Sequence, residues 1–295
     1  MVKHQFGGSW TTEKLERVRK YLVAYTKIFR TNVRAQYFQT TYVDAFAGTG
    51  ARIDATADHD VLGGSLFGLI GDSDVDSFKK GSARIALEVD PPFDHYTFVE
   101  LKPDRAAELE SLTTQFAARD IRVERAEANA FLRSWCSQTN WRRNRAVVFL
   151  DPYGMQVEWR TIEAIADTKA IDLWWLVPLG IGLNRLLTSG GPPPLEWAEA
   201  LTRSLGTDDW RSVFYARSDE PMLFPDDLSE HKVVDVESLG RFVLDRLKSA
   251  FAKVATNPLT LRNSKNTPIY LLCFAAGNPK GATTAVRIAQ DILKK

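Results

Sequence analysis

The chain of 295 residues is poor in the residue types that hold metals and disulfides. It has two isolated cysteines, Cys136 and Cys273, and four scattered histidines. Neither set has the spacing of a metal site or of a disulfide framework, so we expect no bound metal and a reducing, cytoplasmic setting. No apolar run reaches the roughly 18 residues of a membrane-spanning helix, and the polar N-terminus lacks a signal-peptide core. We therefore expect no membrane partner.

A strong net charge is also missing. The 38 Lys and Arg residues nearly balance the 37 Asp and Glu residues, which gives a formal net charge of +1. A general nucleic-acid binder is usually more basic. Local basic stretches nevertheless occur at 13–34, where Lys14 is one of seven cations, and at 141–145. Such stretches can follow phosphates, but they are more often solvated faces.

Apolar strands and amphipathic helices alternate through the first 180 residues. A helix is predicted at 12–34, followed by strands at 41–46, 96–100, 122–125, 146–150 and 171–178. Helices at 104–119, 129–137 and 162–168 separate later strands, and 84–89 fits a strand or a helix. Apolar strands bounded by turns are typical of a parallel sheet buried on both faces. We predict a doubly wound, mostly parallel, Rossmann-like α/β fold.

The sequence Gly-Gly-Pro-Pro-Pro at 190–194 breaks this alternation. Beyond it, helices are predicted at 195–205, 210–215 and 239–254, with a loop at 221–232. Strands at 259–262 and 269–275 and a helix at 283–293 would complete the sheet with an antiparallel edge. We therefore divide the chain into a core with its N-terminal helix (1–181), an inserted helical lobe (182–257) and a core-completing segment (258–295).

The first candidate motif follows the strand at 41–46. It reads Asp44-x-Phe46-x-Gly48-x-Gly50, and glycines let a backbone approach a ligand closely. This form is typical of nitrogen-directed DNA and RNA methyltransferases, in which the turn meets S-adenosylmethionine (SAM). A tight turn that binds nothing is the alternative. A dinucleotide site is disfavoured, because the third glycine of its fingerprint would fall at Ile53.

Further residues are candidates for holding the rest of this cofactor. Glu100 ends a strand, where a carboxylate can accept hydrogen bonds from a ribose diol. Glu127 and Asn129 follow the next strand, and we predict that they meet the adenine amino group. For Glu100, the alternative is a solvated acid at the end of a strand. For Glu127, the alternative is an acid that only stabilises a helix N-terminus.

The substrate side is predicted at the motif Asp-Pro-Tyr-Gly, residues 151–154. In related Asp-Pro-Pro-Tyr-type turns the Asp accepts hydrogen bonds from an amino group and the aromatic ring stacks on the base, so positioning does most of the work. We predict Asp151, Pro152 and Tyr153 as the catalytic turn; the alternative is a proline turn with a surface tyrosine. Asn184 and Arg185 are predicted to face the same pocket, where the arginine could grip a phosphate or carboxylate.

Taken together, these pieces resemble the three-Cys-motif partner protein family (TcmP). The matching segments are Lys14-Leu15, Lys20–Leu22, Tyr42–Gly50, Gly64-Ser65, Phe98–Glu100, Ala128-Asn129, Phe149–Gly154, Ala170–Trp174, Gly182–Arg185, Asn263–Lys265 and Tyr270–Leu272. The resemblance implies a Rossmann-type methyltransferase fold and a partner, the three-cysteine-motif, radical-SAM-like protein of a neighbouring gene. The chain departs from the family at Ala126, where glycine is usual, and at Glu127, where aspartate is common.

The sequence thus favours a SAM-dependent methyltransferase that acts on an amino nitrogen, in a nucleobase of a nucleic acid or in a nucleotide. One rival is a non-catalytic subunit that keeps the fold and binds the three-cysteine protein. A second rival is a nucleotide-binding enzyme of another class that uses the same crevice. Intact Gly48, Gly50, Asp151 and Tyr153 favour an active site over a relic.

Overall fold

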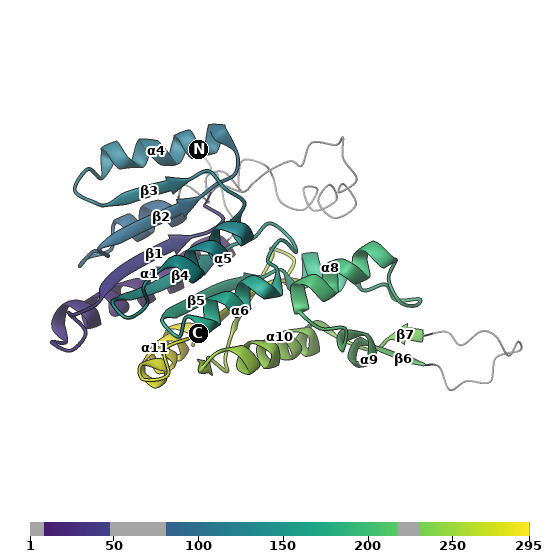
Figure 1. Ribbon diagram of the computed structural model, residues 1–295. Coiled ribbons are helices and arrows are strands. Elements are labelled where there is room, and N and C mark those ends of the chain that lie inside the picture. Colours follow the sequence, from purple (N-terminus) through teal and green to yellow (C-terminus); the bar gives the residue numbers. More distant parts are fainter. Residues whose placement is uncertain (1–8, 48–80, 218–229, 295) are drawn as a thin grey trace, which may run out of the picture.

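A central eight-stranded sheet organises the chain (Figure 1). The computed structural model describes residues 9–47, 81–217 and 230–294. The strand order is β3-β2-β1-β4-β5-β10-β8, and β9 also pairs with β10. These strands are β1 (Gln39–Asp44), β2 (His95–Val99), β3 (Ile121–Glu124), β4 (Asn144–Leu150), β5 (Ile171–Val177), β8 (Lys253–Val254), β9 (Leu259–Arg262) and β10 (Pro268–Ala276).

The first five strands are parallel, and the last three make an antiparallel edge. The neighbouring pairs from β3 to β5 are all parallel. Strand β10 runs antiparallel to β5, β8 and β9. The predicted fold class, a doubly wound and mostly parallel sheet with an antiparallel C-terminal edge, is confirmed.

Helices cover both faces of the sheet, because the strands bury alternate side chains on opposite faces. In β4, Val147 and Phe149 pack with α1 (Ser9–Thr31), α11 (Ala282–Leu293) and the helical residues 81–87. Ala146, Val148 and Leu150 of the same strand pack with α5 (Ala128–Gln138), α6 (Trp159–Asp167) and α10 (Val236–Ala250). Helix α4 (Pro103–Gln115) connects β2 to β3.

A smaller group of elements lies beyond the carboxyl ends of the parallel strands (Figure 1). It consists of the π-helix η1 (Leu179–Leu183), α7 (Asn184–Leu186), α8 (Leu195–Leu205), α9 (Trp210–Phe214) and the hairpin strands β6 (Tyr215–Arg217) and β7 (Glu230–Lys232). Helix α10 also falls within the predicted lobe of 182–257. In the structure it packs on the core, since Leu239, Val243 and Leu247 belong to the same cluster as the sheet residues.

The structure decides two points that the sequence left open or described otherwise. Residues 81–87 are helical, so the segment at 84–89 that fitted either element forms a helix through Leu87. The predicted loop at 221–232 ends in strand β7, because Tyr215, Ala216 and Arg217 pair with Lys232, His231 and Glu230.

Candidate functional site

Three buried carboxylates gather at the carboxyl ends of adjacent strands. Asp44 ends β1 and is in register with Phe98 of β2 and with Phe149 of β4. Glu100 and Asp151 each lie two residues beyond those partners, so all three acids reach the same edge of the sheet. Their residues are 1%, 1% and 8% exposed, respectively. In open α/β sheets this edge is where ligands bind.

Asp44 is held by two hydrogen bonds. Ser82, in the helical segment 81–87, donates its hydroxyl to Asp44 Oδ2 at 2.9 Å, and the Phe46 amide donates to Oδ1 at 3.3 Å. Burial raises the pKa of Asp44 to about 7, and the nearby charge of Asp151 adds to this rise. The two hydrogen bonds and Lys14 oppose it. Asp44 can therefore change its charge near neutral pH. The Phe46 side chain packs into the core.

A buried lysine binds the carboxylate of Asp151. Lys14 Nζ lies 2.7 Å from Asp151 Oδ2, and the two side chains are 0% and 10% exposed. The ammonium also lies 5.6 Å from the Trp10 ring and 5.7 Å from the Phe149 ring. Burial lowers the pKa of Lys14, and the contact with Asp151 offsets only part of this effect. Helix α1 thus contributes directly to the site.

Sequence reasoning missed this lysine, which it counted among the charges of a basic helix. The signal was its position. Lys14 lies four residues before the buried Val18 and seven before the buried Tyr21, so it falls on the apolar stripe of α1. A lone cation on an apolar stripe must pair with an acid when it is buried.

The turn after β4 places Tyr153 beside Asp151. Gly154 has φ +72, a left-handed conformation that glycine adopts readily. The Tyr153 amide donates to Gln156 Oε1 at 3.0 Å, which closes the turn. Tyr270 of β10 lies near this turn. Burial raises the pKa of Tyr270, and the charges of Asp151 and Tyr153 add to this rise. Its ring centroid lies 5.3 Å from that of Trp10.

Glu100 has an open hydrogen-bonding position. Its Oε1 accepts from the Lys102 amide at 2.7 Å. Its Oε2 is buried and has no hydrogen-bond partner among the described residues. Buried polar atoms are usually paired, so an orphaned carboxylate oxygen points to a ligand group that supplies the donor. A hydroxyl of a ribose diol is such a donor.

Glu127 and Asn129 make a network within the protein. Glu127 is the N-cap of α5, where its carboxylate accepts from the amides of Asn129 and Ala130 at 2.9 and 2.7 Å. Asn129 Nδ2 donates to the Gln156 carbonyl at 2.9 Å, and its Oδ1 accepts from the Thr161 hydroxyl at 2.9 Å. These bonds fasten α5 to the segment that follows the 151–154 turn. Contact with adenine remains a prediction.

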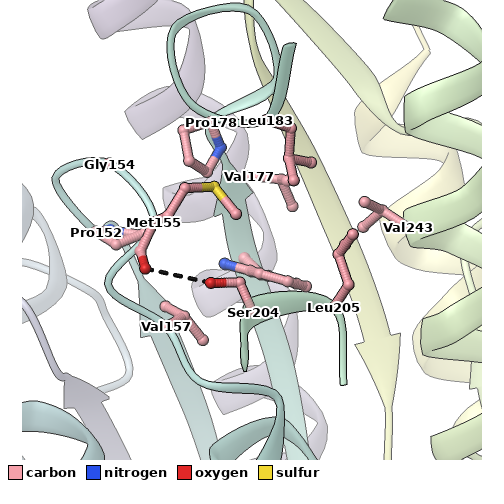
Figure 2. A pocket seen from close by; sticks show the side chains of 11 residues that line it. Pro152, Gly154, Met155, Val157, Val177, Pro178, Leu183, Ser204, Leu205 and Val243 are labelled. Atoms are coloured by element: carbon pink, nitrogen blue, oxygen red, sulfur yellow. Dashed lines mark hydrogen bonds between the residues drawn. The ribbon is translucent and has the colours of Figure 1, made fainter. Parts of the chain in front are cut away.

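The far side of the 151–157 turn is a packed apolar wall, as Figure 2 shows. A cavity of about 10 Å³ remains between this turn, the end of β5 and α8, which is room for about one water. Ser204 of α8 donates to the Met155 carbonyl at 3.2 Å. Helix α8 and the end of β5 therefore support the turn on this side.

The other predicted site residues are placed as follows. Asn184 begins α7, and its Oδ1 accepts from Lys232 Nζ at 2.6 Å. Arg185 is exposed on the same short helix, directly after η1. That both face the substrate pocket remains a prediction. Gly48 and Gly50 fall within 48–80, outside the described residues.

No group of three or more His, Cys, Asp or Glu side chains in the part of the chain that the structure describes could hold a metal ion. Within the same part, no helix has both the length and the apolar character needed to cross a membrane.

Several known structures are similar to this chain at low sequence identity. A DUF519 protein from Legionella pneumophila is 12% identical with a TM-score of 0.47, over 98% of this chain and 92% of that chain. A SAM-dependent methyltransferase from Clostridium acetobutylicum is 11% identical with a TM-score of 0.37, over 88% and 92%. The N-terminal domain of EvdMO1, solved with SAH bound, is 11% identical with a TM-score of 0.36, over 89% and 80%. No family model and no curated protein matches the sequence.

Proposed function

We propose that the protein is a SAM-dependent methyltransferase that acts on an amino nitrogen of a nucleobase or nucleotide. The observation that carries this proposal is the buried, unpaired Oε2 of Glu100, which lies beside Asp44 at the strand ends where such folds bind ligands. The motif turn at 151–154 lies on the other side of Asp44, at the end of the adjacent strand. Cofactor and substrate would therefore meet above β1.

On the cofactor side, Glu100 Oε2 would accept from the ribose diol and ionised Asp44 would attract the ammonium of the methionine part. The segment that contains Gly48 and Gly50 comes soon after β1 in the sequence, and we predict that it lies along the same ligand. When bound, SAM would supply an electrophilic methyl group. The protein has only to aim a nitrogen lone pair at it, so positioning and exclusion of water are its main contributions.

On the substrate side, Lys14 acts as a positioning residue. It binds Asp151 Oδ2, and no hydrogen bond within the described residues engages Oδ1. Oδ1 would therefore accept from the target amine while Lys14 fixes the orientation of the carboxylate. Tyr153 would stack on the ring of the base, and Tyr270 would close the pocket from β10.

Calorimetry with SAM tests the cofactor site. Glu100→Gln keeps the shape of the side chain but offers a weaker acceptor, so it should weaken SAM binding by about 1–3 kcal/mol. The matched control is Glu110→Gln on the exposed face of α4, which should bind SAM as the wild type does. If the wild type does not bind SAM, or if Glu100→Gln binds it equally well, the proposed cofactor site is wrong.

Methyl transfer from labelled SAM tests the reaction. Bacterial nucleic acids and small nucleotides serve as acceptors, with and without the three-cysteine protein that the TcmP resemblance implies. Tyr153→Ala should lower kcat and leave SAM affinity nearly unchanged, because it removes a contact to the acceptor alone. A wild type that binds SAM tightly and labels nothing under either condition would support the non-catalytic partner function instead.

A further inference from the structure

A basic surface lies at the amino ends of β1 and β4, at the end of the sheet opposite the carboxylate site. We define this basic surface by the exposed residues Lys27, Arg34, Tyr37, Arg142 and Arg143. Figure 1 shows the segment after α1 (purple) at the end of the sheet away from the lobe. Residues 17–43 and 128–150, which supply this surface, contain no Asp or Glu.

Defined contacts hold its two segments together. The Gln39 amide donates to the Arg143 carbonyl at 2.9 Å, which aligns the start of β1 with the start of β4. The Arg143 guanidinium lies 5.0 Å from the centre of the Tyr37 ring. Further along the two segments, the Arg145 guanidinium lies 3.9 Å from the centre of the Phe38 ring. The cations are therefore carried on a framework of strands and stacked rings.

Acids among the described residues do not neutralise this basic surface. Asp94, at the start of β2, accepts from Arg30 at 2.7 Å and from Thr40. In the part of the chain that the structure describes, Lys27, Arg34, Arg142 and Arg143 make no ion pair. Apolar groups are exposed among them, since Tyr37 is 58% exposed and Val33 is 81% exposed. Cations beside an exposed aromatic ring favour an anionic partner that also offers flat rings.

We propose that the basic surface binds a single nucleic-acid strand, with the arginines on its phosphates and Tyr37 stacked on a base. Arginine forks match phosphate geometry, and stacking on an aromatic ring is how single strands are held without sequence preference. The inference goes beyond the proposed function, because β1 with six residues separates this surface from Asp44 by roughly 17 Å. Binding here requires neither SAM nor methyl transfer.

Fluorescence anisotropy with a labelled oligouridine of about 15 nucleotides tests the proposal across a series of salt concentrations. The variant Arg34→Gln/Arg142→Gln/Arg143→Gln should bind at least about tenfold more weakly. Its slope of log K against log salt should be shallower by about 2, since each phosphate contact contributes about 0.7 for single strands. Tyr37→Ser, which keeps the charge, should bind at least about fivefold more weakly through lost stacking.

The matched control removes three exposed cations from α8 and α10, Arg203→Gln/Arg241→Gln/Lys248→Gln, and has the same net charge. It should bind the oligonucleotide within about twofold of the wild type. Equal losses in the two triple variants would overturn the proposal, as would a wild type that does not bind at 50 mM salt. Binding of anionic phospholipid vesicles that depends on the same arginines, without oligonucleotide binding, would also overturn it. SAM calorimetry on the arginine variant should be unchanged.

Discussion

Replacing Lys14 with methionine tests whether the buried ion pair holds the site together. The Lys14 side chain is fully buried and Asp151 is nearly so, with their charged atoms 2.7 Å apart. Methionine fills a similar volume, so the change removes the charge and leaves little cavity. Asp151 would then lie unpaired near Asp44, whose pKa its charge already raises. Breaking a buried pair by removing one partner destabilises a protein by about 3–5 kcal/mol.

Urea unfolding measures this loss, and a double variant separates charge from packing. Lys14→Met/Asp151→Asn removes both charges, so it should recover most of the stability that Lys14→Met loses, with a coupling energy of about 2 kcal/mol or more. Lys20→Met is the matched control, because Lys20 forms an exposed pair with Glu16 on the same helix and exposed pairs contribute little. If Lys14→Met and Lys20→Met lose equally little, the buried pair does not stabilise the site.

Two further predictions concern Asp44 and the end of α8. Burial raises the pKa of Asp44 from its ordinary value of 3.8 to about 7. Between these two pH values the folded chain therefore binds more protons than the unfolded chain. The free energy of unfolding falls as pH rises through this window. Asp44→Asn has no carboxyl group to titrate, so its free energy of unfolding lacks this contribution. Urea unfolding should show the variant gaining stability relative to the wild type from pH 5 to pH 8. A difference in free energy of unfolding that does not change with pH would contradict the raised pKa. Gly206→Ala should destabilise by about 2 kcal/mol or more in thermal unfolding, because Gly206 has φ +70 and a Cβ there would lie 2.0 Å from Trp159 Cδ1. Gly190→Ala has open space around it and should change the unfolding temperature little, and equal effects would refute the steric reasoning.

The sheet could be predicted from the sequence because its signals are local. Each parallel strand is a short apolar run that ends at a turn, and runs such as Ile171–Val177 are buried along their whole length. The same pattern put Asp44, Glu100 and Asp151 at strand ends, and parallel pairing then brings strand ends together. Helix α8 also followed from a local signal, since it begins after the Gly/Pro break and ends at Gly206 in the left-handed conformation.

The features that the sequence did not predict depend on contacts between distant segments. Lys14 is buried because Asp151, 137 residues away, receives it; as a charge on a helix it reads as a surface residue. The helical segment 81–87 packs on the core, and its Ser82 donates a hydrogen bond to Asp44. Neither contact can be read from the sequence of the segment alone. The hairpin of β6 and β7 has strands of only three residues each, which is too short for an alternating pattern to stand out.

Helix α1 links the two ends of the sheet. At its start Lys14 pairs with Asp151, and at its end Arg30 binds Asp94 at 2.7 Å. Its 23 residues span roughly 34 Å, enough to cross the whole sheet. Midway along the helix, the Tyr21 hydroxyl donates to Asp172 Oδ2 at 2.7 Å. Burial raises the pKa of Asp172 to about 7, and this hydrogen bond partly opposes the rise. The apolar stripe of α1 thus carries Lys14, which the carboxylate site uses, while its exposed face carries Lys27 of the basic surface and Arg34 follows three residues after its end. One helix can contribute to both the carboxylate site and the basic surface because its two faces and two ends meet different environments. Changes confined to Lys14 should therefore leave the basic surface intact. Changes at Arg34 should leave the carboxylates intact.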